Sequence, residues 1–177
     1  MAIKLTVDKH EINDEIERIG KDILASDIFK RSFLQDHHFS SSVGEHQIHV
    51  ARMSYFLAEV FEKAGASVDK EKLVKAALCH DLGILGRDHR FKSGPDCIHS
   101  HPLNSVEEAK LLIDDIDDVI CDTIATHMWP LTFRRPKYIE GYIITLADKI
   151  SAVQETTFPW YKKKWRELDI LLNYGIE

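Results

Sequence analysis

One stretch decides the fold: Glu71-Lys-Leu-Val-Lys-Ala-Ala-Leu-Cys-His80-Asp81-Leu-Gly-Ile-Leu85. Its apolar residues recur at helical spacing, Asp69 precedes them as a candidate N-cap, and Gly83 is the predicted stop. A histidine and an aspartate side by side at the buried end of a helix cost desolvation free energy unless each finds a partner. A divalent cation satisfies both side chains at once. The stretch therefore predicts a helix that ends in a metal-binding pair.

Composition limits the classes of protein that fit. The chain has 177 residues, 44% of them hydrophobic, which suits one globular domain with a sizeable core. Its three cysteines lack C-x-x-C spacing, so neither a disulfide framework nor a thiolate zinc site is expected. The formal net charge of -6 argues against a nucleic-acid partner. We find no signal peptide and no membrane-spanning stretch, and expect a cytoplasmic protein without a membrane partner.

Hydrophobic periodicity predicts an all-α fold. We expect a single domain over residues 1–177, with N-terminal helices within 8–35, a motif core over 43–155 and a C-terminal helix over 158–173. Residues 1–7 form an extended start, and the serines before Val43 cap the helix that follows. Residues 83–100 are predicted to be a long polar loop, and Pro102 is predicted to begin the next helix. No strand-rich block or internal repeat is present.

Six ionisable side chains fall on apolar helical elements or at their ends. Imidazole nitrogen and carboxylate oxygen without thiolate suit zinc, manganese, iron, nickel or, with more water, magnesium, and argue against a structural zinc site. Adjacent helical side chains point about 100° apart, so a His-Asp pair can share one ion only near the helix end, where the carboxylate also reaches a second ion. The six candidate ligands are His46, His80, Asp81, His101, His127 and Asp148.

The order of these residues resembles the HD-domain metal-dependent phosphohydrolases, a family defined by a histidine, a His-Asp pair and a distal aspartate. The matching segments are Gly-Glu-His46-Gln, Leu-Cys-His80-Asp81-Leu-Gly and Leu-Ala-Asp148-Lys, and the resemblance covers about residues 43–155. It implies that His46, His80, Asp81 and Asp148 hold a first ion. Asp81 and Lys149 would then be the catalytic residues, with Lys149 pairing with a carboxylate or reaching phosphate.

The resemblance extends to the two further histidines of the binuclear members. His101 lies in His101-Pro-Leu-Asn and His127 in Ala-Thr-His127, and with a bridging Asp81 they would hold a second ion. His99 competes with His101, but the proline that follows His101 matches the family. The implied cofactors are two divalent ions, iron or manganese, with zinc, nickel or magnesium as alternatives. The pattern looks most like the bacterial HD hydrolases of diadenosine tetraphosphate.

Cations follow the metal pair directly, as expected for recognition of negative charge. The candidate substrate-binding residues are Arg87, His89, Arg90 and Lys92. The remaining histidines His10, His37, His38 and His49 are interpreted as surface or loop residues, with His49 also a candidate to support a ligand from behind. A second, weaker basic patch is formed by Arg134, Arg135 and Lys137.

The expected partner is a small phosphorylated molecule, most simply a nucleotide, whose phosphoester or phosphoanhydride bond is hydrolysed by metal-activated water. Ile84 replaces the lysine of cyclic dinucleotide phosphodiesterases, and Ile84-Leu85 replaces the acidic pair of guanosine tetraphosphate hydrolases, so both of those substrates are disfavoured. Two alternatives stay open: a one-metal nucleoside monophosphate phosphatase, and a regulatory HD module that binds nucleotide without turnover. The oligomeric state cannot be read from the sequence.

Overall fold

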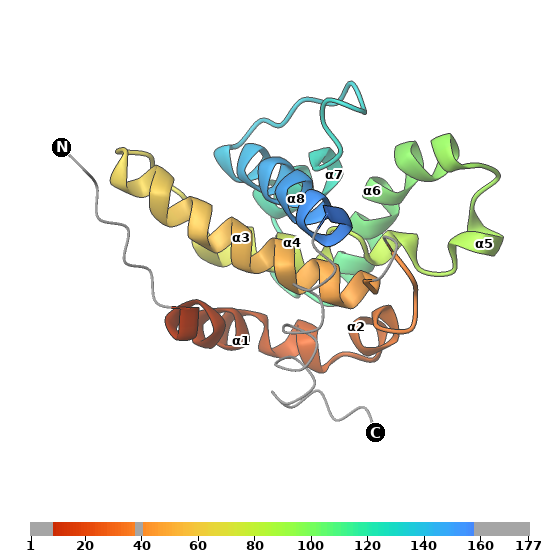
Figure 1. The fold of residues 1–177 in the computed structure, drawn as a ribbon, viewed down its shortest axis with the longest axis horizontal. Helices are drawn as coiled ribbons and strands as arrows, with labels where there is room; N and C mark the ends of the chain where they lie inside the picture. Colours follow the sequence, from red (N-terminus) through yellow and green to blue (C-terminus); the bar gives the residue numbers. More distant parts are fainter. Residues whose placement is uncertain (1–8, 38–40, 158–177) are drawn as a thin grey trace.

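The computed structural model describes residues 9–37 and 41–157 (Figure 1). These residues form eight α-helices and one 3₁₀ turn and contain no β-strand, so the all-α prediction is confirmed. The predicted extended start and C-terminal helix lie outside the described residues. The helices are α1 (Lys9–Ala25), α2 (Asp27–Ser32), α3 (Val43–Lys63), α4 (Lys70–Cys79), α5 (Arg87–Arg90), α6 (Gly94–Lys110), α7 (Asp118–Thr126) and α8 (Ile139–Thr157), with the 3₁₀ turn η1 (Leu82–Ile84) after α4.

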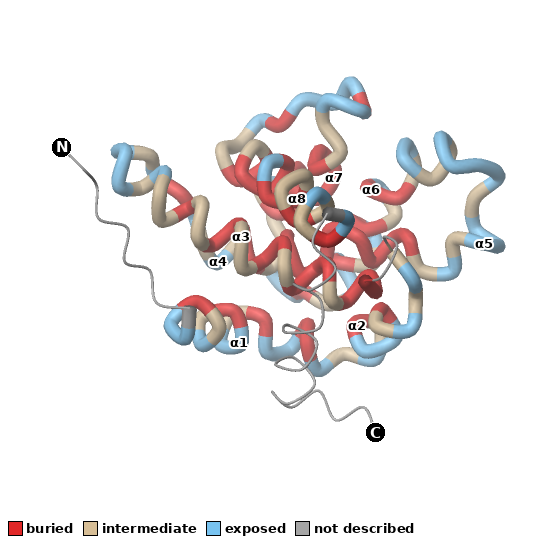
Figure 2. Tube along the Cα trace, viewed as in Figure 1, coloured by how far each residue is buried: buried red, intermediate tan, exposed pale blue. Residues whose placement is uncertain are grey.

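The long helix α3 is the centre of the fold. It packs against α4 and α8, while α1 lies against both α3 and α4 (Figure 1). Figure 2 shows that buried residues line the inward faces of these helices and that exposed residues lie on the outer faces and loops. A single hydrophobic core results. Among its fully buried side chains are Phe29, Leu73, Leu78, Leu82, Ile124, Ile143 and Ile144.

Capping residues fix where the central helices begin and end. The Ser42 hydroxyl accepts from the Glu45 amide and the Glu45 carboxylate accepts from the Ser42 amide, a capping box that starts α3 as predicted. Asp69 caps α4 through the Lys72 amide, also as predicted. Gly65 ends α3 with a φ of 96°, a left-handed conformation that glycine adopts without a Cβ clash.

The predicted loop over residues 83–100 is wrong in the structure. Most of it is helical, because the Ser93 hydroxyl accepts from the Asp96 amide and Pro95 lies in the first turn, so that α6 starts at Gly94. Pro102 is therefore an interior residue of α6 and not its first. The Ser93 cap and Pro95 start the helix before Pro102 is reached. As a result, α6 presents a longer face to η1 and α7, on which it packs.

None of the described helices is both long enough and apolar enough to cross a membrane.

Candidate metal centre

The six candidate ligands come from five helices whose ends or inward faces converge. His46 lies in the first turn of α3, His101 is interior to α6 and Asp148 is interior to α8. The other three follow helix ends: His80 and Asp81 come directly after α4, and His127 comes directly after α7. All six residues are buried. The fold thus collects four imidazoles and two carboxylates inside the protein, where ionisable groups need partners.

The Asp81 carboxylate is the middle of this cluster. Its Oδ1 lies 3.2 Å from His101 Nε2 and 3.4 Å from His127 Nε2. Its Oδ2 lies 3.5 Å from His80 Nε2 on the other side. Burial opposes ionisation of Asp81, yet the surrounding histidines hold its pKa well below the usual range. Asp81 is therefore a carboxylate whose two oxygens face different histidines.

Backbone carbonyls fix the tautomers of three of these histidines. Nδ1 of His80 donates to the Ala77 carbonyl, Nδ1 of His101 to the Cys97 carbonyl and Nδ1 of His127 to the Ile124 carbonyl, each at 2.7 Å. A carbonyl only accepts, so Nδ1 must carry a proton, and in the neutral ring Nε2 then carries the lone pair. Burial lowers the pKa of His80 to about 4, which keeps that ring neutral. Hydrogen bonds of this kind orient imidazoles for a metal.

His46 is held between two carboxylates. Its Nδ1 lies 3.0 Å from Glu155 Oε1, and its Nε2 lies 3.0 Å from Asp148 Oδ1. Burial alone would lower the pKa of His46, but the hydrogen bonds to Asp148 and Glu155 outweigh it and raise the pKa to about 10. Burial likewise opposes ionisation of Asp148, yet its bond to His46 keeps the pKa of Asp148 below its ordinary value. One positive charge, a proton or a cation, is needed between His46 and Asp148.

The spacing of these atoms fits a divalent cation. Two ligand atoms that each lie about 2.1 Å from an ion are about 3.0 Å apart at right angles and about 3.4 Å apart at tetrahedral angles. The Nε2 atoms of His101 and His127 are 3.0 Å apart, so two neutral rings with Nδ1 protonated would face each other with lone pairs, and a proton or a cation between them removes that repulsion. Within the described chain neither His80 Nε2 nor Asp81 Oδ1 has a hydrogen-bond partner. These residues therefore fit a metal.

The comparison with known proteins agrees with this geometry. Residues 43–153 match the model of the HD-domain family, which is more than half of the chain. The chain belongs to the HD-domain family. Members of this family are generally metal-dependent hydrolases, so the resemblance drawn from the sequence is confirmed at that level. No curated protein and no solved structure matches the chain.

All six candidate ligands lie inside the matched HD domain, but two residues that reach the cluster lie outside it. His37, interpreted from the sequence as a surface or loop residue, does lie in a loop, but its side chain turns inward and its Nε2 lies 3.3 Å from Asp81 Oδ2. Glu155 was not singled out at all. Its carboxylate accepts from His46, from His49 and, at 2.7 Å, from the Ser41 hydroxyl. A His-His dipeptide in a loop and a glutamate two residues beyond the match carry no motif that would have found them.

Lys149, predicted to be catalytic, reaches the edge of the HD-domain cluster. Its Nζ donates to Asp148 Oδ2 at 2.7 Å and to the His127 carbonyl at 3.4 Å. It thereby ties α8 to the end of α7 on the rim of the cluster. The Lys149 side chain remains 37% exposed, so it is also open to a ligand from solvent.

The predicted substrate-binding residues are on α5 and just beyond it, at the edge of the molecule in Figure 1. His89, Arg90 and Lys92 are exposed and Arg87 is half-buried. Arg90 approaches Glu108 of α6 at 3.4 Å. His99, the competitor of His101, is exposed on α6, whereas His101 faces Asp81. The structure thus brings His101, and not His99, into the cluster.

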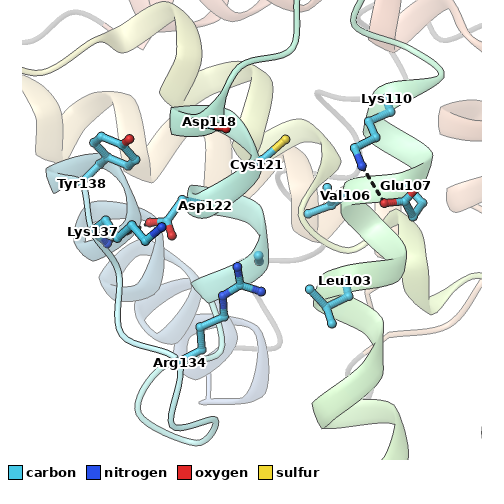
Figure 3. Close-up of a pocket in the computed structure, with 11 residues that line it drawn as sticks. Leu103, Val106, Glu107, Lys110, Asp118, Cys121, Asp122, Arg134, Lys137 and Tyr138 are labelled. Carbon is cyan, nitrogen blue, oxygen red and sulfur yellow. Dashed lines mark hydrogen bonds and ion pairs between the residues drawn. The ribbon is translucent and has the colours of Figure 1, made fainter.

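A separate pocket of about 300 Å³ lies between α6, α7 and the segment before α8 (Figure 3). Arg134 and Lys137 of the second basic patch line it, while the Lys137 backbone amide donates to Asp122 at 2.8 Å. None of the six candidate ligands lines this pocket. Its walls mix both charge signs, as Figure 3 shows for Arg134 and Lys110 beside Glu107 and Asp122.

Proposed function

We propose that this HD-domain protein hydrolyses a phosphoester or phosphoanhydride bond of a small phosphorylated substrate, most simply a nucleotide, with two divalent cations. One observation carries the proposal. The buried Asp81 carboxylate has imidazoles of different helices at its two oxygens, and the Nε2 atoms of those imidazoles converge on it. A core histidine that served packing alone would have its second nitrogen paired, whereas His80 Nε2 has no hydrogen-bond partner among the described residues.

The ligands divide into two groups that share Asp81. His46, His80 and Asp148 offer ligand atoms close enough for one cation, with Asp81 Oδ2 3.5 Å from His80 Nε2, and His101 and His127 would hold another together with Asp81 Oδ1. Bound at these positions, the cations would act as Lewis acids that lower the pKa of water and neutralise phosphoryl oxygens. The donor set of imidazole and carboxylate favours manganese, iron or zinc over a purely oxygen-bound metal.

The protein's own residues bind and orient the substrate. Lys149 holds Asp148 by its Nζ and is partly exposed, so a phosphate at the rim can replace solvent as its second partner. Arg87, Arg90 and Lys92 have no lone pairs for a metal, and their role is to attract the negatively charged substrate. The helices around the cluster exclude water, which strengthens every charge interaction inside it.

Release of inorganic phosphate tests the proposal. Purified protein loaded anaerobically with Mn²⁺ or Fe²⁺ is incubated with nucleoside mono-, di- and triphosphates and with dinucleoside polyphosphates. We expect turnover of at least one compound, with loss of turnover in Asp81→Asn and retention in His99→Ala, which alters an exposed neighbour. Absence of turnover from metal-loaded protein on every compound would contradict catalysis and favour the regulatory module. Turnover of monophosphates alone, with one ion per chain, would favour the one-metal phosphatase.

A further inference from the structure

His37 is held in the short segment between α2 and α3. Asp36 and Ser42 form an antiparallel bridge, and the His37 amide donates to the Ser41 carbonyl at 2.9 Å. The Val43 amide donates to the Gln35 carbonyl at 2.9 Å, so the segment is also fixed to the start of α3. The backbone at residues 35–37 is therefore hydrogen-bonded to residues 41–43, and the His37 side chain is only 9% exposed.

The imidazole of His37 points at the carboxylate that the six candidate ligands share. His37 Nε2 lies 3.3 Å from Asp81 Oδ2, and the His37 ring lies 4.5 Å from the His46 ring between centroids. Asp81 Oδ2 therefore faces His37 and His80, just as Asp81 Oδ1 faces His101 and His127. Each oxygen of one carboxylate is thus met by two imidazole nitrogens at 3.2 to 3.5 Å.

We propose that His37 is a seventh ligand of the metal centre and binds, through Nε2, the cation on the Oδ2 side of Asp81. This inference rests on the proposed function, because it assumes that a cation lies there. The separation of 3.3 Å falls in the range of about 3.0 to 3.4 Å that two ligands of one ion adopt. His37, His46 and Asp81 also offer three ligand atoms within 4.8 Å of one another.

Ligation by His37 has a consequence for the fold. The matched HD domain starts at residue 43, so His37 adds a ligand from a segment that precedes it. The Ser41 hydroxyl donates to Glu155, which in turn accepts from His46. The segment before α3 therefore contacts the centre twice, once through His37 and once through Ser41 and Glu155. Removing the His37 imidazole should weaken binding of the ion on the Oδ2 side and leave binding of the ion on the Oδ1 side unchanged.

Titration of metal-free protein with Mn²⁺, followed by calorimetry, tests this with a readout that does not depend on activity. In wild type we expect two binding steps. In His37→Ala one step should weaken by about 10-fold or more, while the other changes by less than about 2-fold. His99→Ala is the matched control, because this histidine is exposed and should leave both steps unchanged. The visible absorption of Co²⁺-loaded protein gives a second readout, which should change in His37→Ala and not in His99→Ala.

His37→Gln separates a ligand from a hydrogen-bond donor. Its amide can still donate to Asp81 but has no imidazole nitrogen, so it should behave like His37→Ala if His37 binds the cation. It also replaces His37→Ala should that variant lose its helical circular dichroism. Two unaltered binding steps and an unaltered Co²⁺ spectrum in a folded His37 variant would overturn the inference while leaving the proposed function intact. Wild-type protein that binds no Mn²⁺ would instead overturn both.

Discussion

Single residues at the centre act through charges that are largely buried. Asp81 is surrounded by imidazoles, and in three of them Nδ1 donates to a backbone carbonyl, which leaves Nε2 to face Asp81 or a cation. The thiol of Cys79, beside the same pair, is different. Burial strongly raises its pKa, so it remains a protonated, apolar side chain. Neighbours in sequence therefore have opposite roles, one in the centre and one in the core.

Replacing Asp81 by asparagine keeps its size and removes the shared charge. We predict that Asp81→Asn lowers the rate of phosphate release by more than about 100-fold. Mutating a residue that only hydrogen-bonds a metal ligand already lowers metal affinity or activity by about 10- to 100-fold, and Asp81 would be a ligand itself. Circular dichroism should be unchanged. Cys79→Ala is the control and should retain activity, since its thiol takes no part. Activity above about a tenth of wild type in Asp81→Asn would place the centre elsewhere.

The raised pKa of His46 predicts how metal binding depends on pH. In metal-free protein its pKa is about 10, so at neutral pH a proton must leave before a cation can use Nε2. Between neutral pH and about pH 10, each unit by which the pH rises should then strengthen that binding step by up to about tenfold. His80, with a pKa of about 4, is already neutral and adds no dependence above pH 5. Anaerobic Mn²⁺ titrations at several pH values measure the slope.

Glu155→Gln is the informative comparison for this pH dependence. It removes one of the two carboxylates that raise the pKa of His46, so the affinity should stop rising with pH at a lower pH than in wild type. Thr156→Ala, at an exposed neighbour, should keep the wild-type slope. A wild-type affinity that does not change with pH would show that no proton leaves His46 on binding.

At the scale of elements, the contact between η1 and α6 sets the position of Asp81 against His101. Gly83 lies in η1 and allows the two elements to touch: a Cβ there would be 2.4 Å from the His101 carbonyl oxygen and 2.5 Å from the Ser105 amide nitrogen. The Gly83 amide also donates to the Ser105 hydroxyl at 2.9 Å. Gly83 was predicted to stop the helix, but α4 already ends at Cys79 and Gly83 lies within η1, so that prediction is wrong and the glycine serves packing instead.

Gly83→Ala should force η1 away from α6. We predict a loss of about 1 to 3 kcal/mol in the free energy of unfolding and weaker binding of the cation near His101, because backbone atoms cannot yield to the new methyl group. Gly94→Ala is the matched control: nothing lies within 4 Å of its Cβ, and it should be neutral. Chemical denaturation and Mn²⁺ titration measure the two effects. Equal stability of both variants would contradict the close approach.

The cations of α5 and the residues after it belong to a separate element on the outside of the molecule. Replacing Arg87, Arg90 and Lys92 together by alanine should raise KM without changing metal content, because arginine and lysine cannot ligate a cation. Steady-state kinetics on the preferred nucleotide and elemental analysis measure both quantities. Unchanged kinetics would identify these residues as ordinary solvated charges, and loss of metal would mean that α5 supports the centre itself.

For the whole molecule, the sequence predicted the fold better than the limits of its helices. Periodicity was sufficient for α3 and α8, whose apolar faces are long, and capping residues gave the starts of α3 and α4. The prediction of helix limits failed over residues 83–100. Ser93 and Pro95 begin α6 there, whereas Pro102 was expected to begin it. Local signals of similar strength compete there, and only packing of α6 on η1 and α7 decides between them.

The ligand cluster shows the same division. His46, His80, His101, His127 and Asp148 could be collected from motifs because each lies in a segment that resembles the family. His37 and Glu155 could not, because their proximity to the cluster depends on how the ends of α3 and α8 meet in three dimensions. A histidine in a loop belongs to no helical repeat of apolar residues, so the sequence does not indicate whether it is buried. Long-range contacts of this kind are where a single sequence is least informative.

The central claim is that Asp81 is shared by two cations, and anomalous diffraction from crystals grown with Mn²⁺ tests it most directly. We predict two anomalous peaks in the cluster: one beside Asp81 Oδ1 with His101 and His127, and one beside Asp81 Oδ2 with His46, His80 and Asp148. A single peak would contradict the two-ion centre, and the absence of any peak within reach of Asp81 would contradict the metal centre altogether.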